Sequence, residues 1–288
     1  MNSNQWFKKW RSLYLALGLA SVSLPVWANP HLIENTASHS GDASVVAIDV
    51  LDAVEGAIQY IQVSNISDEQ EVEIGKQTNQ QVLQQYQLYD SPQIQQYVSN
   101  LGQELLNSSD SRDIPFTFQV VASDEVNAFA TPGGFVYVTT GLLRAAENRA
   151  QLASVVAHEI AHINERHGIK GLKQAVAAQG IANTVGVDSD TLAQMAYKLA
   201  VDLPQSRSFE YEADSSGLKI LQQAGYPPQA FANFLAKLEG GGGTPEFIRT
   251  HPTSENRIEA ISQTEANAQT GNKGLDKSEY QNNVIAYL

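Results

Sequence analysis

"VVAHEIAHINERHG", residues 155–168, places two histidines, His158 and His162, four positions apart, with Glu159 directly after the first. On a helix, residues four apart lie on one face, about one turn from each other. His158 and His162 can therefore direct ring nitrogens at one shared point. That is the geometry of a pair of zinc ligands.

The residues around these histidines predict where their helix begins and ends. Asn148 can cap the helix, which is expected to run to about His167 and to stop at Gly168. His167 follows His158 by nine residues and so falls on nearly the opposite side of this helix. With Arg166, it suits the negative C-terminal end of a helix, and we expect a structural role for both residues.

Glu159 adds a carboxylate that is offset by one residue from the metal-facing pair. A zinc ion lowers the pKa of a bound water towards about 7, and Glu159 can take the proton of this water without being a ligand. His-Glu-x-x-His is the arrangement of zinc peptidases. The alternative is a helix with ordinary surface histidines. The helix is instead expected to be buried, because its flanks are apolar: Val155, Val156, Ile160 and Ile163. A buried helix gains nothing from unpaired imidazoles.

A catalytic zinc ion takes three protein ligands and keeps one open position, so a third ligand must come from elsewhere. The stretch "SRSFEYEADSSG", residues 206–217, predicts a second helix on which Glu210 and Asp214 share a face. We assign Glu210 to the zinc ion, one per chain. Asp214 is expected behind His158, where it accepts a hydrogen bond and fixes the histidine tautomer. Glu212 lies about 200° round the helix from Glu210 and is expected to face solvent.

The remaining patterns predict an α+β fold, mostly helical, with a small sheet of about three strands beside the His-Glu-x-x-His helix. Residues 116–122 and 126–140 are β-rich, and the second stretch reads as two strands joined through Pro132-Gly133-Gly134. Asn127, Ala128 and Phe129 are candidates for a sheet edge that binds an extended peptide through its backbone. Helices are expected at 47–61, 67–86, from Ser91-Pro92 to about 105, and at 171–184, 190–202, 206–224, 228–239 and 254–265.

The N-terminus has the three-part pattern of an export signal. A basic start is followed by an apolar run from Leu13 to about Val22 and by a cleavage site after Ala28. The run is shorter than the roughly 20 residues of a membrane span, so we expect cleavage and no stable membrane insertion. Removing the three basic residues of the signal takes the formal charge from −13 to −16. Such an acidic chain does not favour nucleic acid. The absence of cysteine excludes thiol chemistry and cysteine-based zinc sites.

Four stretches together resemble metallopeptidase family forty-eight of the gluzincins, over about residues 70–265. They are "HEIAH", "EYEAD", "NAFATPGGFVYVTTGLL" upstream and "THPTSENRI" downstream. The Glu-x-x-Ala-Asp pattern of that family falls on Glu210, Ala213 and Asp214, in agreement with the spacing argument. The chain is similar to the small, soluble, periplasmic members of the family. This resemblance implies proteolysis in quality control of envelope proteins.

Two further residues have open roles. His251, in "THPTSENRI", is a candidate catalytic residue, mainly on the resemblance. It either donates a hydrogen bond to the oxyanion formed in peptide attack or occupies the open position of the zinc ion and holds the enzyme idle. Arg207 lies three residues before Glu210 and either contacts substrate or forms a structural salt bridge.

The sequence thus predicts four segments: a signal peptide (1–28), an N-terminal tail and helical extension (29–66), a zinc metallopeptidase domain (67–265) and a polar C-terminal tail (266–288). The favoured hypothesis is an exported, periplasmic or otherwise extracytoplasmic zinc endopeptidase that acts on unfolded or extended polypeptides. The alternative is a chaperone-like or binding protein with a closed, latent zinc site. The sequence leaves the oligomeric state open.

Overall fold

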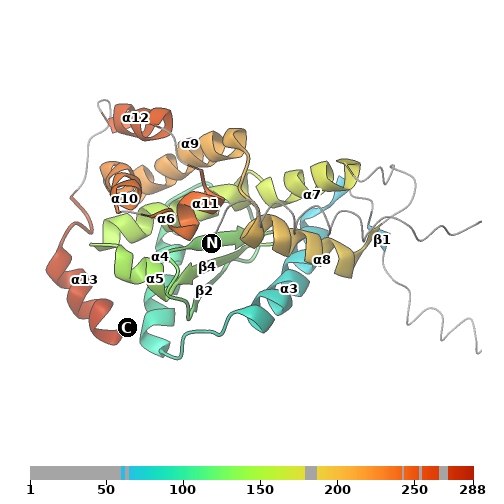
Figure 1. The fold of residues 1–288 in the computed structure, drawn as a ribbon, viewed down its shortest axis with the longest axis horizontal. Helices are drawn as coiled ribbons and strands as arrows, with labels where there is room; N and C mark the ends of the chain where they lie inside the picture. Colours follow the sequence, from blue (N-terminus) through green and yellow to red (C-terminus); the bar gives the residue numbers. More distant parts are fainter. Residues whose placement is uncertain (1–59, 62–64, 179–186, 242, 253–254, 266–271) are drawn as a thin grey trace, which may run out of the picture. The chain divides into compact units, whose positions relative to one another are not determined.

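The computed structural model describes residues 60–61, 65–178, 187–241, 243–252, 255–265 and 272–288 (Figure 1). The predicted α+β class is confirmed, since helices dominate the described chain around a three-stranded sheet. That sheet consists of β2 (Thr117–Val121), β3 (Ala128–Thr131) and β4 (Phe135–Thr139), and β1 (Tyr60–Ile61) pairs with β5 (Val187–Asp188). The helices are α3 (Asp68–Gln85), α4 (Pro92–Asn107), α5 (Thr140–Ala145), α6 (Arg149–Asn164), α7 (His167–Ala178), α8 (Ser189–Tyr197), α9 (Arg207–Gln223), α10 (Gln229–Gly240), α11 (Glu246–Thr250), α12 (Glu255–Glu265) and α13 (Lys277–Asn283). None of these helices is both long enough and apolar enough to cross a bilayer.

The three-stranded sheet is mixed and has the order β2-β4-β3. β2 pairs with β4 in parallel, and β3 pairs with β4 in antiparallel fashion, so β3 is an edge strand. The predicted turn joins β3 to β4, and Gly133 and Gly134 adopt φ of 77° and 95° there. A Cβ atom at Gly134 would lie 1.9 Å from the carbonyl oxygen of Pro115, so this turn requires glycine.

Helix α6, which carries the His-Glu-x-x-His motif, is buried on all sides. Every residue from Ala150 to Ile163 is buried, and Asn148 caps the helix by accepting from the backbone N–H of Gln151. In Figure 1, α6 lies between α9 and the sheet, and it packs against β3, β4, α4, α9 and α10. Polar side chains on such a helix must find their partners inside the protein.

A glycine sets the separation between α6 and α9. A Cβ atom at Gly217 of α9 would lie 3.1 Å from the Cα atom of His158 and 3.2 Å from the carbonyl oxygen of Ala157. A larger residue at position 217 would therefore require one of the two backbones to shift by a few tenths of an ångström. This close approach brings the first turns of α9 against the motif face of α6.

The predicted end of the motif helix is wrong by three residues. Helix α6 ends at Asn164, and Arg166 then adopts a left-handed conformation with φ of 56°. Ion pairs from Arg166 to Asp68 and Glu71, and a hydrogen bond to the carbonyl of Ile66, hold this turn. Such distant partners leave no local signal in the sequence. Gly168 is thus no stop but lies within α7, which begins at His167 instead of 171.

Most other predicted helices match. α3 and α4 start after the expected serine caps, and α9, α10 and α12 coincide with their predictions within one or two residues. The helix expected at 190–202 is α8 followed by a π-helical turn, η2 (Lys198–Asp202). Of the helix expected at 47–61, only the end is described, and Ile61 lies in strand β1 instead because it pairs with Val187. The rest of that segment and the signal lie outside the described residues.

The C-terminal segment is not the loose polar tail that its composition indicates. Its described part, 272–288, forms α13 and a short 3₁₀ turn, η3 (Ile285–Tyr287). Tyr280 and Val284 are fully buried, and the Tyr280 hydroxyl donates to the carbonyl of Leu143. Two apolar residues four apart make one helix face, and this face is sufficient to anchor the segment to the core.

Candidate metal centre

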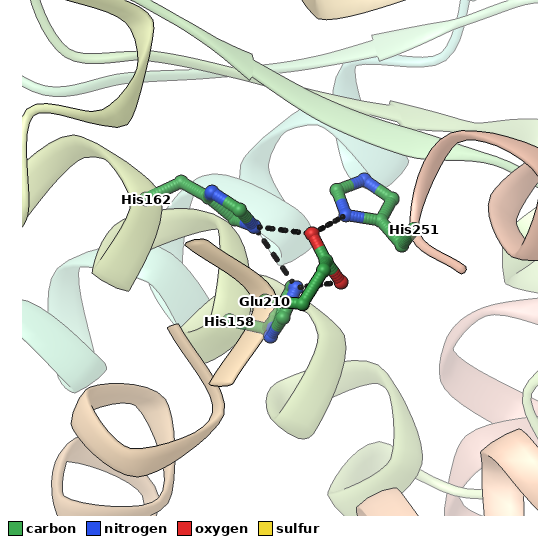
Figure 2. Close-up of side chains that lie close together, drawn as sticks. All are labelled: His158, His162, Glu210 and His251. Atoms are coloured by element: carbon green, nitrogen blue, oxygen red, sulfur yellow. Dashed lines mark hydrogen bonds and ion pairs between the residues drawn. The ribbon is translucent and has the colours of Figure 1, made fainter. Parts of the chain in front are cut away.

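Four side chains from three parts of the chain meet inside the protein. His158 and His162 come from α6, Glu210 from the first turn of α9, and His251 directly follows α11. One nitrogen or oxygen atom of each lies within 4.8 Å of the corresponding atoms of the other three, and all four residues are buried. Figure 2 shows the Glu210 carboxylate between the three imidazole rings. The structure thus brings together the three predicted zinc ligands and the candidate catalytic histidine.

The distances within this group fit a tetrahedral ion. The Nε2 atoms of His158 and His162 are 3.0 Å apart. The carboxylate oxygens of Glu210 lie 3.6 Å from His158 Nε2 and 3.4 Å from His162 Nε2. Two ligands of a tetrahedral zinc ion with bonds of about 2.0–2.1 Å are separated by about 3.3 Å. Two imidazoles and a carboxylate are also ligand types that zinc favours.

Asp214 lies where the sequence predicts it, behind His158. Its Oδ1 atom is 3.2 Å from His158 Nδ1, one turn of α9 beyond Glu210. A carboxylate only accepts hydrogen bonds, so the proton of neutral His158 belongs on Nδ1 and the lone pair of Nε2 faces the group. Asp214 therefore orients a ring nitrogen as a metal ligand requires.

Arg257 is a residue of this site that sequence reasoning missed. It is buried and donates two hydrogen bonds of 2.7 Å to the two oxygens of Asp214. Its Nη1 atom also forms an ion pair with Glu210 at 2.7 Å. Arg257 lies within the "THPTSENRI" stretch. Its place in a motif of the family was the only sequence signal that could have indicated a role at the site. The guanidinium balances the charge of two buried carboxylates.

The predicted position of His167 needs correction, and Glu212 is its partner. Because the chain reverses at Arg166, His167 does not lie on the far side of the motif helix, and its Nδ1 is 2.8 Å from Nδ1 of His162. Its Nε2 is 2.9 Å from Glu212 Oε2. Glu212 is exposed, as predicted, but it also pairs with Lys170 at 3.0 Å. Burial lowers the pKa of His167 despite the hydrogen bond with Glu212, so His167 is neutral near pH 7.

Glu159 is buried next to the group, and neither of its carboxylate oxygens has a hydrogen-bond partner among the described residues. The Nε2 atom of His251 lies 3.5 Å from Glu159 Oε1. Burial raises the pKa of Glu159, while His251 and His158 oppose the shift. A carboxylate with a raised pKa and free lone pairs can accept a proton and return it.

The two motif histidines differ strongly in basicity. Burial lowers the pKa of His158, but Asp214 and Glu210 outweigh it and raise the pKa to about 9. Burial lowers the pKa of His162 to about 3, even though Glu210 opposes it. Without a metal ion, a single proton therefore resides between the two Nε2 atoms, on His158. Burial opposes ionisation of Glu210 too, but the three histidines hold its pKa well below its usual range.

The candidate substrate residues are placed differently. Asn127 and Ala128 are buried, and the side-chain oxygen of Asn127 has no partner among the described residues. Phe129 is buried against Tyr137, with ring centroids 4.7 Å apart, and lines a cavity beside the site. Arg207 is exposed at the start of α9 and does not join the group. It forms no ion pair with any described residue, so the salt bridge, one of its two predicted roles, is not observed.

A cavity of about 370 Å³ opens beside the four-residue group. Glu159, His162 and His251 line it on one side, and the end of strand β3 contributes Phe129 and Ala130. Small residues on α7 and η2, among them Ala175 and Ala200, line it further out. The unpartnered carboxylate of Glu159 therefore faces a space that can hold part of another molecule.

An HExxH helix completed by a glutamate from a later helix is the arrangement of gluzincin metallopeptidases. The chain belongs to peptidase family M48, whose model matches residues 92–265, and the resemblance drawn from the sequence is confirmed. It is 34% identical to the β-barrel assembly-enhancing protease of Escherichia coli K12 over 212 residues, which cover 68% of this chain and 44% of that protein.

Mitochondrial relatives match as well. The chain is 30% identical to the mitochondrial metalloendopeptidase OMA1 of Schizosaccharomyces pombe over 187 residues, covering 62% of this chain and 56% of that protein. Among the bacterial relatives, the chain is also 32% identical to the β-barrel assembly-enhancing protease of Yersinia pestis over 215 residues. The chain spans less than half the length of the bacterial relatives it matches.

Proposed function

We propose that this protein is a zinc-dependent endopeptidase, with the zinc ion held by His158, His162 and Glu210. The observation that supports this most directly is the buried meeting of these three side chains next to the unpartnered carboxylate of Glu159. Two imidazole nitrogens 3.0 Å apart, both turned inward, share one proton in the metal-free protein, and a divalent cation replaces that proton.

When bound, zinc supplies Lewis acidity, which polarises the scissile carbonyl and makes water at the site more acidic. Glu159 then accepts a proton from the attacking water on a carboxylate oxygen. The water oxygen bonds to the carbonyl carbon, the C–N bond breaks, and Glu159 returns the proton to the leaving amine nitrogen. Asp214 and Arg257 hold His158 in place throughout.

We propose unfolded or extended segments of exported proteins as substrates. Strand β3 is at the sheet edge and ends at the cavity, so a peptide added beside it would lie close to Glu159. Backbone pairing of this kind reads extended chains and excludes folded ones. The bacterial relatives are named for enhancing β-barrel assembly. By that likeness, β-barrel proteins that fail to assemble are the proposed substrates, and the export pattern of residues 1–28 supports a periplasmic location.

The position of His251 favours a second state of the site. Its ring lies between Glu159 and Glu210, 3.5 Å from the first and 3.1 Å from the second. In this position His251 can serve as the fourth ligand of the metal, in place of the attacking water. We propose that the structure represents a closed form of the enzyme. The latent zinc-binding protein remains the alternative function.

Cleavage of casein by the purified protein, with its metal content measured in parallel, tests this proposal. We expect about one zinc per chain and slow cleavage by the wild type. Glu159→Gln should keep the zinc and lose activity by about 10²-fold or more. Cleavage that persists in Glu159→Gln would refute the mechanism. Zinc binding without cleavage by the wild type, even after His251→Ala, would support the latent protein instead.

A further inference from the structure

A chain of hydrogen bonds runs from the protein surface to the ring of His162. It starts at the exposed carboxylate of Glu212, passes through both ring nitrogens of buried His167, and ends at Nδ1 of His162. The two contacts measure 2.9 Å and 2.8 Å. His158 has a carboxylate, Asp214, directly behind it, whereas His162 has a second histidine in that place.

The positions of the protons in this chain follow from its outer end. A carboxylate of Glu212 can only accept, so Nε2 of His167 must donate to it. Nδ1 of neutral His167 is then an acceptor. Nδ1 of His162 must therefore carry a proton and donate it to Nδ1 of His167. This leaves the lone pair of His162 on Nε2, which faces Glu210 and His158.

We propose that His167 is a positioning residue of the metal centre, which fixes the tautomer and ring orientation of His162 and is itself fixed by Glu212. The inference rests on the proposed function only in treating the four-residue group as a metal site. What it adds is the link between the exposed carboxylate of Glu212 and the ring of buried His162.

The surrounding structure holds His167 in this position from several directions. Arg166 takes a left-handed conformation, unfavourable for an arginine, and this reversal aims His167 back at α6. Asp68 and Glu71 of α3 bind Arg166, and Arg112 binds both Glu71 and the carbonyl of Ile163 at the end of α6.

The ring of His167 is also clamped from one face. Phe209, the residue before Glu210, stacks on it with centroids 4.4 Å apart and an interplanar angle of 12°. Rotation of the ring, which would exchange its donor and acceptor nitrogens, is therefore opposed by packing. The same helix α9 thus supplies a metal ligand, the stacking ring and the outer carboxylate.

The test compares two substitutions of different chemistry at one position. His167→Asn places an amide oxygen near the position of Nδ1 and can accept from His162, whereas His167→Leu fills similar space and accepts nothing. Zinc affinity is measured by competition with a chelator, with Lys173→Met, an exposed change on the same helix, as control. Loss of a hydrogen-bond partner behind a ligand histidine weakens metal binding about 10- to 100-fold.

We expect His167→Leu to lose zinc affinity by this factor. His167→Asn and Lys173→Met should bind zinc within about threefold of wild type. All three variants should unfold at similar urea concentrations. Imidazole ¹⁵N spectra of the metal-free protein should show His162 protonated on Nδ1 in the wild type and in His167→Asn. Equal affinity in His167→Leu and wild type, or equally weak binding in both His167 variants, would overturn the proposal. Failure to cleave any peptide would count against the proposed function alone, because neither measurement uses activity.

Discussion

Arg257 and Asp214 form a buried, bidentate ion pair, with both hydrogen bonds at 2.7 Å. Because Oδ1 of Asp214 also lies 3.2 Å from Nδ1 of His158, this arginine acts on the metal centre through one carboxylate. It additionally contacts Glu210, so its removal leaves two buried carboxylates without their cation.

The first prediction concerns the stability that this pair confers. Removing one partner of a buried ion pair typically costs about 3–5 kcal/mol, because the remaining charge is left uncompensated. Arg257→Met should therefore lower the free energy of unfolding by about that amount, measured by urea denaturation with a chelator present. Arg144→Met, at an exposed pair with Asp124, should change it by at most about 1 kcal/mol. A similar decrease in the free energy of unfolding in the two variants would show that Arg257 does not stabilise the site.

The second prediction concerns the proton between the two motif histidines. Because the pKa of His158 is raised to about 9, this side chain is charged in the metal-free protein at pH 7, and zinc must displace its proton. Affinity should therefore fall as pH falls below about 9, by about tenfold per pH unit for one proton. Calorimetric titration in two buffers with different ionisation enthalpies counts the protons released. Release of none at pH 7 would contradict the assignment.

The third prediction concerns the cavity beside Glu159. Ala175 lines it, whereas Ala177, two residues further along α7, is exposed and does not. Ala175→Phe should fill part of the space and lower kcat/KM on peptides at least tenfold while zinc affinity stays unchanged. Ala177→Phe is the matched control and should leave both unchanged. Full activity in Ala175→Phe would mean that substrate enters by another route.

The fourth prediction concerns the C-terminal segment. Tyr280 is fully buried and donates to the carbonyl of Leu143, whereas Tyr287 is 46% exposed. Truncation of a large buried aromatic residue to alanine costs about 3–5 kcal/mol. Tyr280→Ala should therefore lower the midpoint of urea denaturation strongly, and Tyr287→Ala should change stability by no more than about 0.5 kcal/mol. Equal effects would restore the idea of a loose tail.

Features encoded by local patterns could be predicted from the sequence. The caps at Ser91 and Asn148, the glycine turn between two β-rich stretches, and the spacing of His158, His162, Glu210 and Asp214 all act within a few residues. Because i and i+4 share a helix face, the chemistry of each half of the site follows from spacing alone. The meeting of the two histidines of α6 with the carboxylates of α9 depends on helix packing, and it was expected only because the motifs resemble those of a known family.

Features set by distant partners could not be predicted. The reversal at Arg166 depends on residues of α3 about 100 positions earlier, and no glycine marks it. Without that reversal, His167 is assigned to the wrong side of its helix. Arg257 shows the same limit, since the value of a buried arginine depends on carboxylates 43 or more residues away. The packing of the C-terminal segment against the core could not be predicted, because two apolar residues, Tyr280 and Val284, in a polar stretch give too weak a periodic pattern.

Gly217 supplies no ligand atom to the four-residue group, but it lies against the backbone of His158 and so affects how far apart the two halves of the group lie. It is two helical turns from Glu210, on the side of α9 that rests on the backbone of His158. The spacing between the imidazoles and the carboxylate is therefore built into the main chain before any ion arrives. A methyl group at position 217 would require the backbones of α6 and α9 to shift apart by a few tenths of an ångström, and the ligands on the two helices would move with them.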